Sequence, residues 1–199
     1  MKRLFLLLSL LVGFTTLAQG ELKVIETPIF TVEYSEDYEQ PVKLSYVVDC
    51  WDGQFSRSGL NFYGVEGVHT SSNADYKNNV WDKGHLAPAA AFKCDEEELR
   101  MTFSYLNCAL QHEDLNRGPW KYLEAHEREL AASFGKVEVT IYVHFNNSQR
   151  LQTGAMVPSG FTKEITLIDH EDCTITTKYY FPNNGFVSRN DNFLDFQIK

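Results

Sequence analysis

The clearest pattern of apolar and polar positions lies between residues 137 and 145. Apolar residues occupy every second position of this run, namely Val137, Val139, Ile141, Val143 and Phe145. A period of two predicts a half-buried β-strand, because successive side chains of a strand point to opposite faces. Three further runs, rich in β-branched and aromatic residues, are also predicted to be strands: 42–48, 161–168 and 174–181. The cluster Pro182-Asn183-Asn184-Gly185 marks a turn after the last of them.

Two other segments carry the start and stop residues of helices. Asp95 suits an N-cap, and the glutamates that follow it place negative charge where the helix dipole favours it, which predicts a helix from Asp95 to about Phe103. In the second segment Pro119 suits a first helical position and Gly135 suits a C-terminal cap. An apolar stripe runs between them: Trp120, Leu123, Leu130 and Phe134.

The length of 199 residues fits one domain of ordinary size, and the chain has neither internal repeats nor a linker-like stretch. The first 18 residues resemble a secretory signal peptide: a basic start at Lys2-Arg3, an apolar run over residues 4–14 and a small-residue site ending at Ala18. The apolar run is too short to span a bilayer. We therefore expect a signal peptide over residues 1–18 and a single domain over 19–199, secreted or periplasmic and not membrane-bound.

Export makes the cysteines candidates for disulfide bonds, because oxidising compartments let such bonds persist. The chain has four of them, which allow three pairings: Cys50, Cys94, Cys108 and Cys173. The alternative is that some or all stay reduced and buried as small apolar residues. None of them forms a Cys-x-x-Cys pair, which argues against a zinc ribbon.

The most informative motif is residues 81–92, WDKGHLAPAAAF, which places His85 after an aspartate, a lysine and a glycine. A histidine with an ordinary pKa of about 6.5 is largely neutral near pH 7 and can accept a proton. Gly84 would allow a backbone turn before it. His85 is therefore a candidate general base, and the alternative is a structural histidine at the end of a strand.

Three more segments join this motif in a recognisable order: residues 73–77 (NADYK), 102–111 (TFSYLNCALQ) and 115–128, which begins LNRGPW. Together the four segments resemble the DNA/RNA non-specific endonucleases, the ββα-metal or His-Me-finger family that includes secreted bacterial nucleases and mitochondrial endonuclease G. The resemblance extends over about residues 46–183. It implies an α+β fold with a central, mainly antiparallel sheet, helices packed on that sheet and a ββα-metal nuclease core.

The resemblance implies that Asn116 holds a Mg²⁺ ion, with Mn²⁺ as the alternative metal. An amide oxygen is a hard, neutral ligand that Mg²⁺ accepts while it keeps most of its water. The alternative for Asn116 is an ordinary helix N-cap. Glu124 lies eight residues further on, roughly 12 Å along an ideal helix, so a hydrogen bond to metal-bound water suits it better than direct ligation. A surface ion pair with Arg128, one turn along, is the alternative for Glu124.

The other residues carried over from the family concern the substrate. Arg57 is expected to contact the scissile phosphate, with Lys83 or Arg128 also countering phosphate charge, and its alternative is a solvated loop arginine. Asn107 is expected near the site as a hydrogen-bonding, substrate-side residue, with a buried structural amide as the alternative. Lys83 stands where arginine is commonest in the family, which replaces a bidentate fork with a point charge.

The net charge of −9 opposes a nucleic-acid role, because non-specific binding of a polyanion rests on clustered cations. A group of basic residues nevertheless falls within one part of the chain: Arg57, Lys77, Lys83, Lys93, Arg100, Arg117, Lys121 and Arg128. This distribution predicts a basic cleft on an acidic body, with weak and salt-dependent binding.

The resemblance thus implies a secreted, metal-dependent endonuclease that cuts DNA and RNA with little sequence preference and leaves 5′-phosphates. Two alternatives differ in function: a nuclease-like fold that binds nucleic acid without cutting it, and a phosphodiesterase for small substrates. An inhibitor protein is a candidate partner, and the sequence leaves the oligomeric state open.

Overall fold

A computed structural model describes residues 21–146, 148–168 and 174–199. The predicted signal peptide and the connection His170-Glu171-Asp172 lie outside these ranges. Among the helices of the described residues, none is long and apolar enough to cross a membrane.

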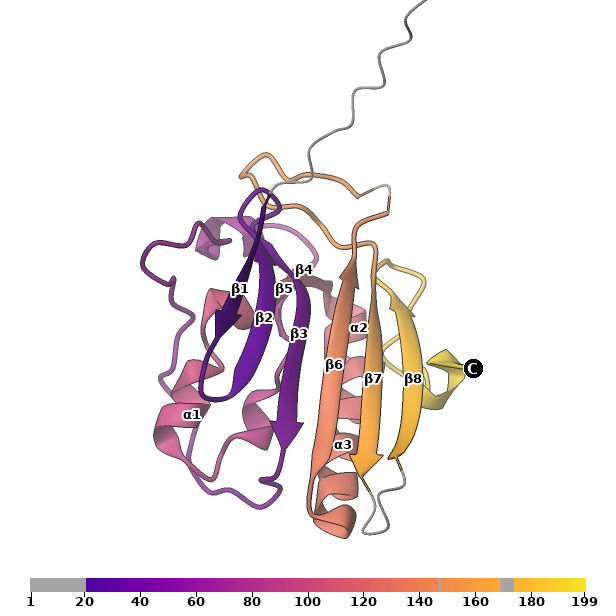
Figure 1. Cartoon of the computed structure of the whole chain (residues 1–199). Coiled ribbons are helices and arrows are strands. Elements are labelled where there is room, and N and C mark those ends of the chain that lie inside the picture. The colour runs from indigo at the N-terminus through magenta and orange to yellow at the C-terminus, as the bar shows by residue number, and fades with distance from the viewer. Residues whose placement is uncertain (1–20, 147, 169–173) are drawn as a thin grey trace, which may run out of the picture.

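A seven-stranded antiparallel sheet forms the frame of the protein, with strand order β1-β2-β3-β6-β7-β8-β9 (Figure 1). The strands are β1 (Leu22–Glu26), β2 (Phe30–Ser35), β3 (Gln40–Val48), β6 (Val137–His144), β7 (Gly160–Ile168), β8 (Thr174–Pro182) and β9 (Gln197–Ile198). Strand β6 shows the predicted alternation, with its odd-numbered residues buried and its even-numbered residues half-buried. All the neighbouring strands pair antiparallel, so the predicted mainly antiparallel sheet is confirmed.

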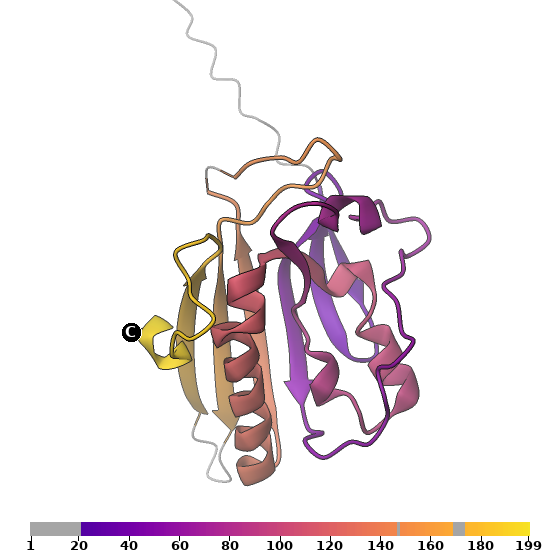
Figure 2. The ribbon, with the colours of Figure 1, turned by 180° about the vertical axis from the view of Figure 1, so that it is seen from behind.

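Residues 49–136 leave the sheet between β3 and β6, although these two strands are hydrogen-bonded neighbours. This excursion contains the two-stranded ribbon of β4 (Trp81–His85) and β5 (Cys108–His112) and the helices α1 (Glu96–Met101), α2 (Glu113–Arg117) and α3 (Pro119–Phe134). It also contains three short 3₁₀ turns: η1 (Asn73–Tyr76), η2 (Ala89–Ala91) and η3 (Tyr105–Asn107). Seen from behind, the excursion covers one face of the sheet (Figure 2). Outside the excursion, a fourth 3₁₀ turn, η4 (Phe193–Phe196), precedes β9.

Both predicted helices are present, with the expected caps. The Asp95 side chain accepts hydrogen bonds from the backbone N–H groups of Glu97 and Glu98, so α1 begins where predicted but ends two residues earlier than expected. Helix α3 begins at Pro119 and ends before Gly135, whose φ of 84° suits glycine.

The predicted apolar stripe of α3 is wrong at its end. Trp120 and Leu123 are fully buried, but Phe134 is 48% exposed, because Ala131 takes the buried position nearest the end of the helix. Leu130 is partly buried against the core.

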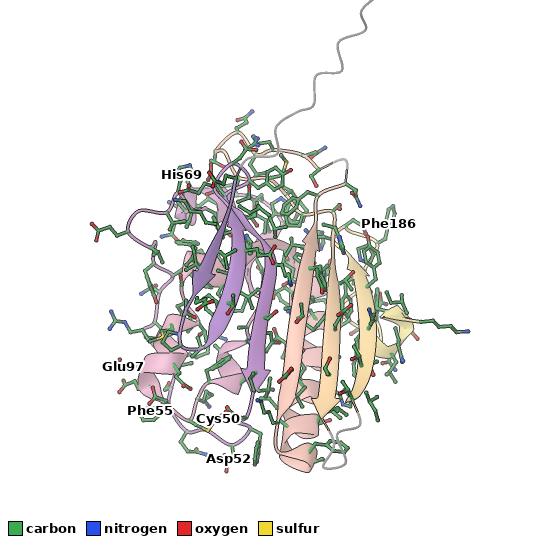
Figure 3. All side chains as sticks on the ribbon, viewed as in Figure 1. Cys50, Asp52, Phe55, His69, Glu97 and Phe186 are labelled. Carbon is green, nitrogen blue, oxygen red and sulfur yellow. A yellow bond between two sulfur atoms is a disulfide. The ribbon has the colours of Figure 1, made fainter. Side chains whose placement is uncertain are left out.

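One disulfide bond joins Cys50, just after β3, to Cys94, just before α1, with the two Cα atoms 5.9 Å apart. Figure 3 places Cys50 at the same end of the molecule as Asp52 and Phe55. The bond closes a loop with a sequence separation of 44 residues, for which chain entropy in the unfolded state predicts a stabilisation of about 4 kcal/mol. One of the candidate bridges is therefore present, whereas Cys108 is free and buried as in the alternative. Cys173 lies outside the described residues.

A buried ion pair fastens α3 to the sheet. Lys163 on β7 and Glu127 on α3 are both fully buried, and their Nζ and Oε1 atoms lie 2.7 Å apart. The hydroxyl of Tyr46 on β3 donates a hydrogen bond of 2.7 Å to the other oxygen of Glu127. The Lys163 ammonium also lies 4.0 Å from the centre of the Trp120 ring. These contacts connect two strands and one helix through two buried charges.

Removing one partner of this pair is expected to cost far more than removing both charges. Lys163→Met leaves the Glu127 carboxylate buried and uncompensated, and should lower the free energy of unfolding by about 3–5 kcal/mol. The double variant with Glu127→Gln should lose less, because the amide is neutral and its oxygen can still accept from Tyr46. Urea denaturation measures both.

The matched control is Lys178→Met, which removes an exposed lysine on the same sheet from its ion pair with Glu164 and should leave stability nearly unchanged. Equal stability of the single and double variants at the buried pair would contradict the expectation.

Candidate active site

A cleft of about 550 Å³ opens between the β4–β5 ribbon, the loop before it and the helices α2 and α3. It is lined by Arg57, Phe62, Asp82, Lys83, His85, Pro88, Ala89, Ala90, Phe103, Asn116, Arg117, Lys121, Glu124 and Arg128. Six of the seven predicted site residues are in this set, although they lie on segments far apart in the sequence. The remaining one, Asn107, is not.

His85 is the last residue of β4, and close contact between the two strands of the ribbon fixes its position. Gly84 faces Gln111 of β5 so closely that an added Cβ would lie 2.4 Å from the Gln111 side-chain oxygen and 2.6 Å from its Cβ. The expected turn at Gly84 is therefore wrong, because this residue lies inside a strand. The glycine is needed for the close approach of β5.

Asn107 holds the backbone that follows His85. Its side-chain oxygen accepts a hydrogen bond of 2.7 Å from the Ala87 N–H, and its amide donates to the carbonyls of Ala87 and Thr102 at 2.9 and 2.8 Å. The side chain is fully buried and does not line the cleft. The expectation that Asn107 contacts substrate is corrected: it is the buried structural amide of the alternative interpretation, and it supports the histidine from behind.

The imidazole of His85 lies in an apolar setting. The ring centroids of Phe62 and Phe103 are 4.8 and 4.9 Å from that of His85. Its Nε2 is buried and has no hydrogen-bond partner among the described residues. Burial, with a smaller contribution from the positive charge of Arg57, lowers the pKa of His85 to about 3. The ring is therefore neutral near pH 7, the state in which a histidine can accept a proton.

Asn116 lies inside the five-residue helix α2 and does not cap a helix, so the N-cap alternative is wrong. Its amide nitrogen donates a hydrogen bond of 2.8 Å to Oδ2 of Asp82 on β4. This contact fixes which end of the amide is the donor. The side-chain oxygen accepts no hydrogen bond from any described residue and can serve as a ligand.

Glu124 and Arg128 lie on α3, which is separated from α2 by the non-helical backbone of Gly118. Because the helix is interrupted at this glycine, Glu124 lies at the same cleft as Asn116 despite their separation in sequence. Arg128 donates a hydrogen bond of 2.8 Å to the backbone carbonyl of Glu124, and within the described ranges the two side chains form no ion pair. Burial raises the pKa of Glu124 to about 7, against the opposing effect of the Lys163 charge.

Lys83 is held within a group of aromatic rings. Its ammonium lies 5.4, 5.8 and 5.7 Å from the ring centres of Phe62, Tyr76 and Tyr105. It also donates a hydrogen bond to the side-chain oxygen of Asn73, which accepts a second bond of 3.0 Å from the Tyr105 hydroxyl. The charge of Lys83 is therefore fixed at the wall of the cleft.

Arg57 is exposed on the loop after β3, and its guanidinium carbon lies 6.0 Å from the centre of the Phe103 ring. Of the remaining charged residues of the cleft, Asp82 was not predicted, and Arg117 and Lys121 were predicted only as members of the basic group, without individual roles. Asp82 lies next to Lys83 and Arg117 lies next to Asn116 within the two motifs, and this position in the sequence could have identified both as site residues. With five cations and two carboxylates, the cleft is basic on an acidic chain, as the charge distribution predicted.

The donors that could hold a metal ion are few. Within the described part of the chain, no group of three or more His, Cys, Asp or Glu residues could hold one. The cleft instead offers the amide oxygen of Asn116 and the carboxylate of Glu124. Such hard oxygen donors fit Mg²⁺, which binds few protein groups and keeps several waters.

Comparisons with known proteins show the family to which the chain belongs. Residues 11–199 match the family described as DNA/RNA non-specific endonuclease. The chain is 34% identical to mitochondrial endonuclease G of Bos taurus over 90 residues, which is 44% of this chain and 30% of that protein. It is 37% identical to mitochondrial nuclease EXOG of Danio rerio over 75 residues, 38% of this chain and 22% of that protein. Both matches thus span less than a third of the relative.

Two broader matches extend the comparison. The chain is 26% identical to nuclease C1 of Cunninghamella echinulata var. echinulata over 147 residues, 68% of this chain and 58% of that protein. A crystal structure of the EndoG/EndoGI complex superposes with a TM-score of 0.78 at 23% identity, covering 91% of this chain and 82% of that one. This structural likeness confirms the predicted fold, an α+β arrangement with a ββα-metal nuclease core.

The charge state of His85 can be measured directly. In NMR titrations of its ring resonances, His85 should stay neutral down to about pH 4, given its pKa of about 3. Arg57→Met should raise this pKa, because it removes a nearby like charge. Arg150→Met, which removes an arginine paired with Asp37 outside the cleft, is the control and should leave it unchanged. Titration of His85 near 6.5, or no response to Arg57→Met, would contradict this description.

Proposed function

Because the chain belongs to the DNA/RNA non-specific endonuclease family, we propose that it hydrolyses phosphodiester bonds of DNA and RNA with a divalent metal ion. The observation that carries the proposal is the convergence of a neutral histidine, an amide with a free oxygen and several cations in one cleft. Binding of phosphate by these cations does not require a particular base, which suits cleavage with little sequence preference.

His85 is the general base of the proposed reaction. Its imidazole accepts a proton from the attacking water, and the rise in its pKa when the phosphodiester monoanion enters the cleft favours that transfer. Arg57, Lys83 and Arg128 counter the negative charge that develops on the phosphate oxygens. The resemblance to the family implies that the products are 5′-phosphates.

Asn116 would hold the metal through its side-chain oxygen, and Glu124 would accept a hydrogen bond from a water of the ion. A bound Mg²⁺, or Mn²⁺ in its place, supplies Lewis-acid stabilisation of the negative charge on the leaving oxygen. Glu124 is suited to the task because its position on α3 is fixed by the buried pair of Glu127 and Lys163 one turn further along.

We further propose that the protein acts outside the cytoplasm, in a secreted or periplasmic location. The signal-peptide pattern of residues 1–18 and the disulfide between Cys50 and Cys94 support this location. The relatives named above include mitochondrial proteins, so the compartment is a property proposed for this chain alone. An inhibitor protein is a proposed partner, by analogy with the EndoG/EndoGI complex.

The proposed reaction is tested by cleavage of plasmid DNA and of RNA. Purified protein should degrade both with Mg²⁺ and should stop when EDTA removes the metal. His85→Ala should lower the rate by about 10²–10⁴-fold, the usual contribution of a general base, and Asn116→Ala should lower it by loss of metal. His69→Ala is the control, because His69 is exposed outside the cleft.

Unchanged cleavage by His85→Ala would overturn the assignment. Salt-sensitive binding without cleavage in any of several divalent metals would select a binding protein, and cleavage of small diesters alone would select a small-substrate phosphodiesterase.

A second test concerns Lys83 as a phosphate contact. Binding of an oligonucleotide to the His85→Ala protein is measured over a range of NaCl concentrations. Lys83→Met should weaken binding of all sequences alike and reduce the slope of log affinity against log salt by about 1, the value for one lost contact. Lys178→Met removes a lysine from the sheet and should not change the slope. An unchanged slope in the Lys83 variant would exclude the contact.

A further inference from the structure

A chain of ion pairs begins in the segment between β8 and η4, outside the cleft. Arg189 in this segment contacts both acidic residues at the start of α2. Its Nη2 lies 3.0 Å from Oε2 of Glu113, and its Nε donates a hydrogen bond of 2.5 Å to Oδ1 of Asp114. One arginine near the C-terminus thus holds the first turn of a helix that carries Asn116.

The chain continues from Glu113 into the cleft. The same Oε2 of Glu113 lies 2.7 Å from Nη1 of Arg117. Arg117 in turn forms a two-point contact with Asp82, at 2.6 Å from Nη2 and 2.8 Å from Nε. Oδ2 of Asp82 accepts the hydrogen bond from the Asn116 amide. A continuous series of ion pairs and hydrogen bonds therefore runs from Arg189 to the proposed metal ligand.

Backbone packing holds the same segment in place. An added Cβ at Gly118 would lie 2.6 Å from the Cα of Arg189 and 2.8 Å from its carbonyl oxygen. The segment after β8 therefore lies directly against the junction of α2 and α3, as the view from behind also shows (Figure 2). Figure 3 shows that Phe186 points away from the molecule. Val187 is buried in the core, and Arg189 connects this segment to the charged first turn of α2.

The energetics of these contacts favour a role in orientation. Each ion pair is partly exposed and adds little to global stability by itself. Helix α2 has only five residues, too few to be stable without contacts to its surroundings. Its direction therefore depends on what holds its ends, and Arg189 holds the first turn while Asp82 holds the last.

We propose that Arg189 is a positioning residue for the metal site: through Glu113, Arg117 and Asp82 it fixes the rotation of the Asn116 amide, so that the oxygen faces the cleft. The inference rests on the proposed role of Asn116 as metal ligand. It adds a contribution of the C-terminal segment to a site whose other parts all lie between Arg57 and Arg128.

The coupling is tested first without metal. The side-chain amide resonances of Asn116 are assigned in ¹⁵N-labelled protein by their loss in Asn116→Ala. In Arg189→Met they should shift or broaden, because the hydrogen bond to Asp82 is no longer held in one geometry. Arg150→Met, which removes a comparably exposed arginine from its pair with Asp37, should leave them unchanged.

The consequence is tested by Mn²⁺ binding, followed by electron paramagnetic resonance of the free ion. Partners that orient a ligand usually change metal affinity by about 10–100-fold, and Arg189 acts through three intermediate residues, so its loss should raise the Kd by about 3–10-fold. Arg189→Lys keeps a charge without the fork and should fall between Met and wild type. Thermal unfolding of each variant checks that the fold is retained, and Arg189→Lys serves if Arg189→Met does not fold.

The outcomes separate this inference from the proposed function. If Asn116→Ala binds Mn²⁺ as tightly as wild type, the metal role of Asn116 fails, and the inference fails with it. If Asn116→Ala weakens binding but the Arg189 variants leave either the Asn116 resonances or the Kd unchanged, only the inference is overturned.

Discussion

The buried pair of Lys163 and Glu127 is the interaction on which the arrangement of the molecule depends. Two charges without access to water are tolerated only when each has a partner, and here the carboxylate is shared between Lys163 and Tyr46 on two strands. This requirement fixes α3 on the sheet in one position. Glu124, one turn before Glu127, is then presented to the cleft on a helix that cannot rotate. The same Lys163 charge opposes the rise in the pKa of Glu124 that burial causes, so the pair acts on both the position and the ionisation of that carboxylate.

The distribution of charge reconciles an acidic chain with the polyanionic substrate proposed for it. Five cations converge on the cleft, while the excess of acidic residues lies elsewhere. Two of these cations have carboxylate or carbonyl partners in the free protein: Arg117 with Asp82, and Arg128 with the Glu124 backbone. These contacts hold the cations at the cleft before substrate arrives.

The sequence predicted some parts of this structure well, and the reasons for the failures are physical. Alternation located β6, and cap residues located α1 and α3, because these signals are local. Strand β5 was missed because it is buried on both faces and has no alternation. The glycine at position 84 suggested a turn, but it is needed because the side chain of Gln111 on the neighbouring strand leaves no room for a Cβ atom. Short motifs identified six residues of the cleft, whereas the contribution of Arg189 depends on contacts across more than seventy residues of sequence.

The lysine at position 83 is matched to its surroundings. A guanidinium stacks on the face of one ring, whereas a compact ammonium can lie near several rings at once. Phe62, Tyr76 and Tyr105 all lie within 6 Å of the Lys83 nitrogen, measured to their ring centres. A free lysine loses considerable rotamer entropy when it binds a phosphate, and a lysine already held by three rings loses less. In the proposed reaction, Lys83 would therefore meet the phosphate as a single charge that three aromatic rings hold in place before the substrate binds.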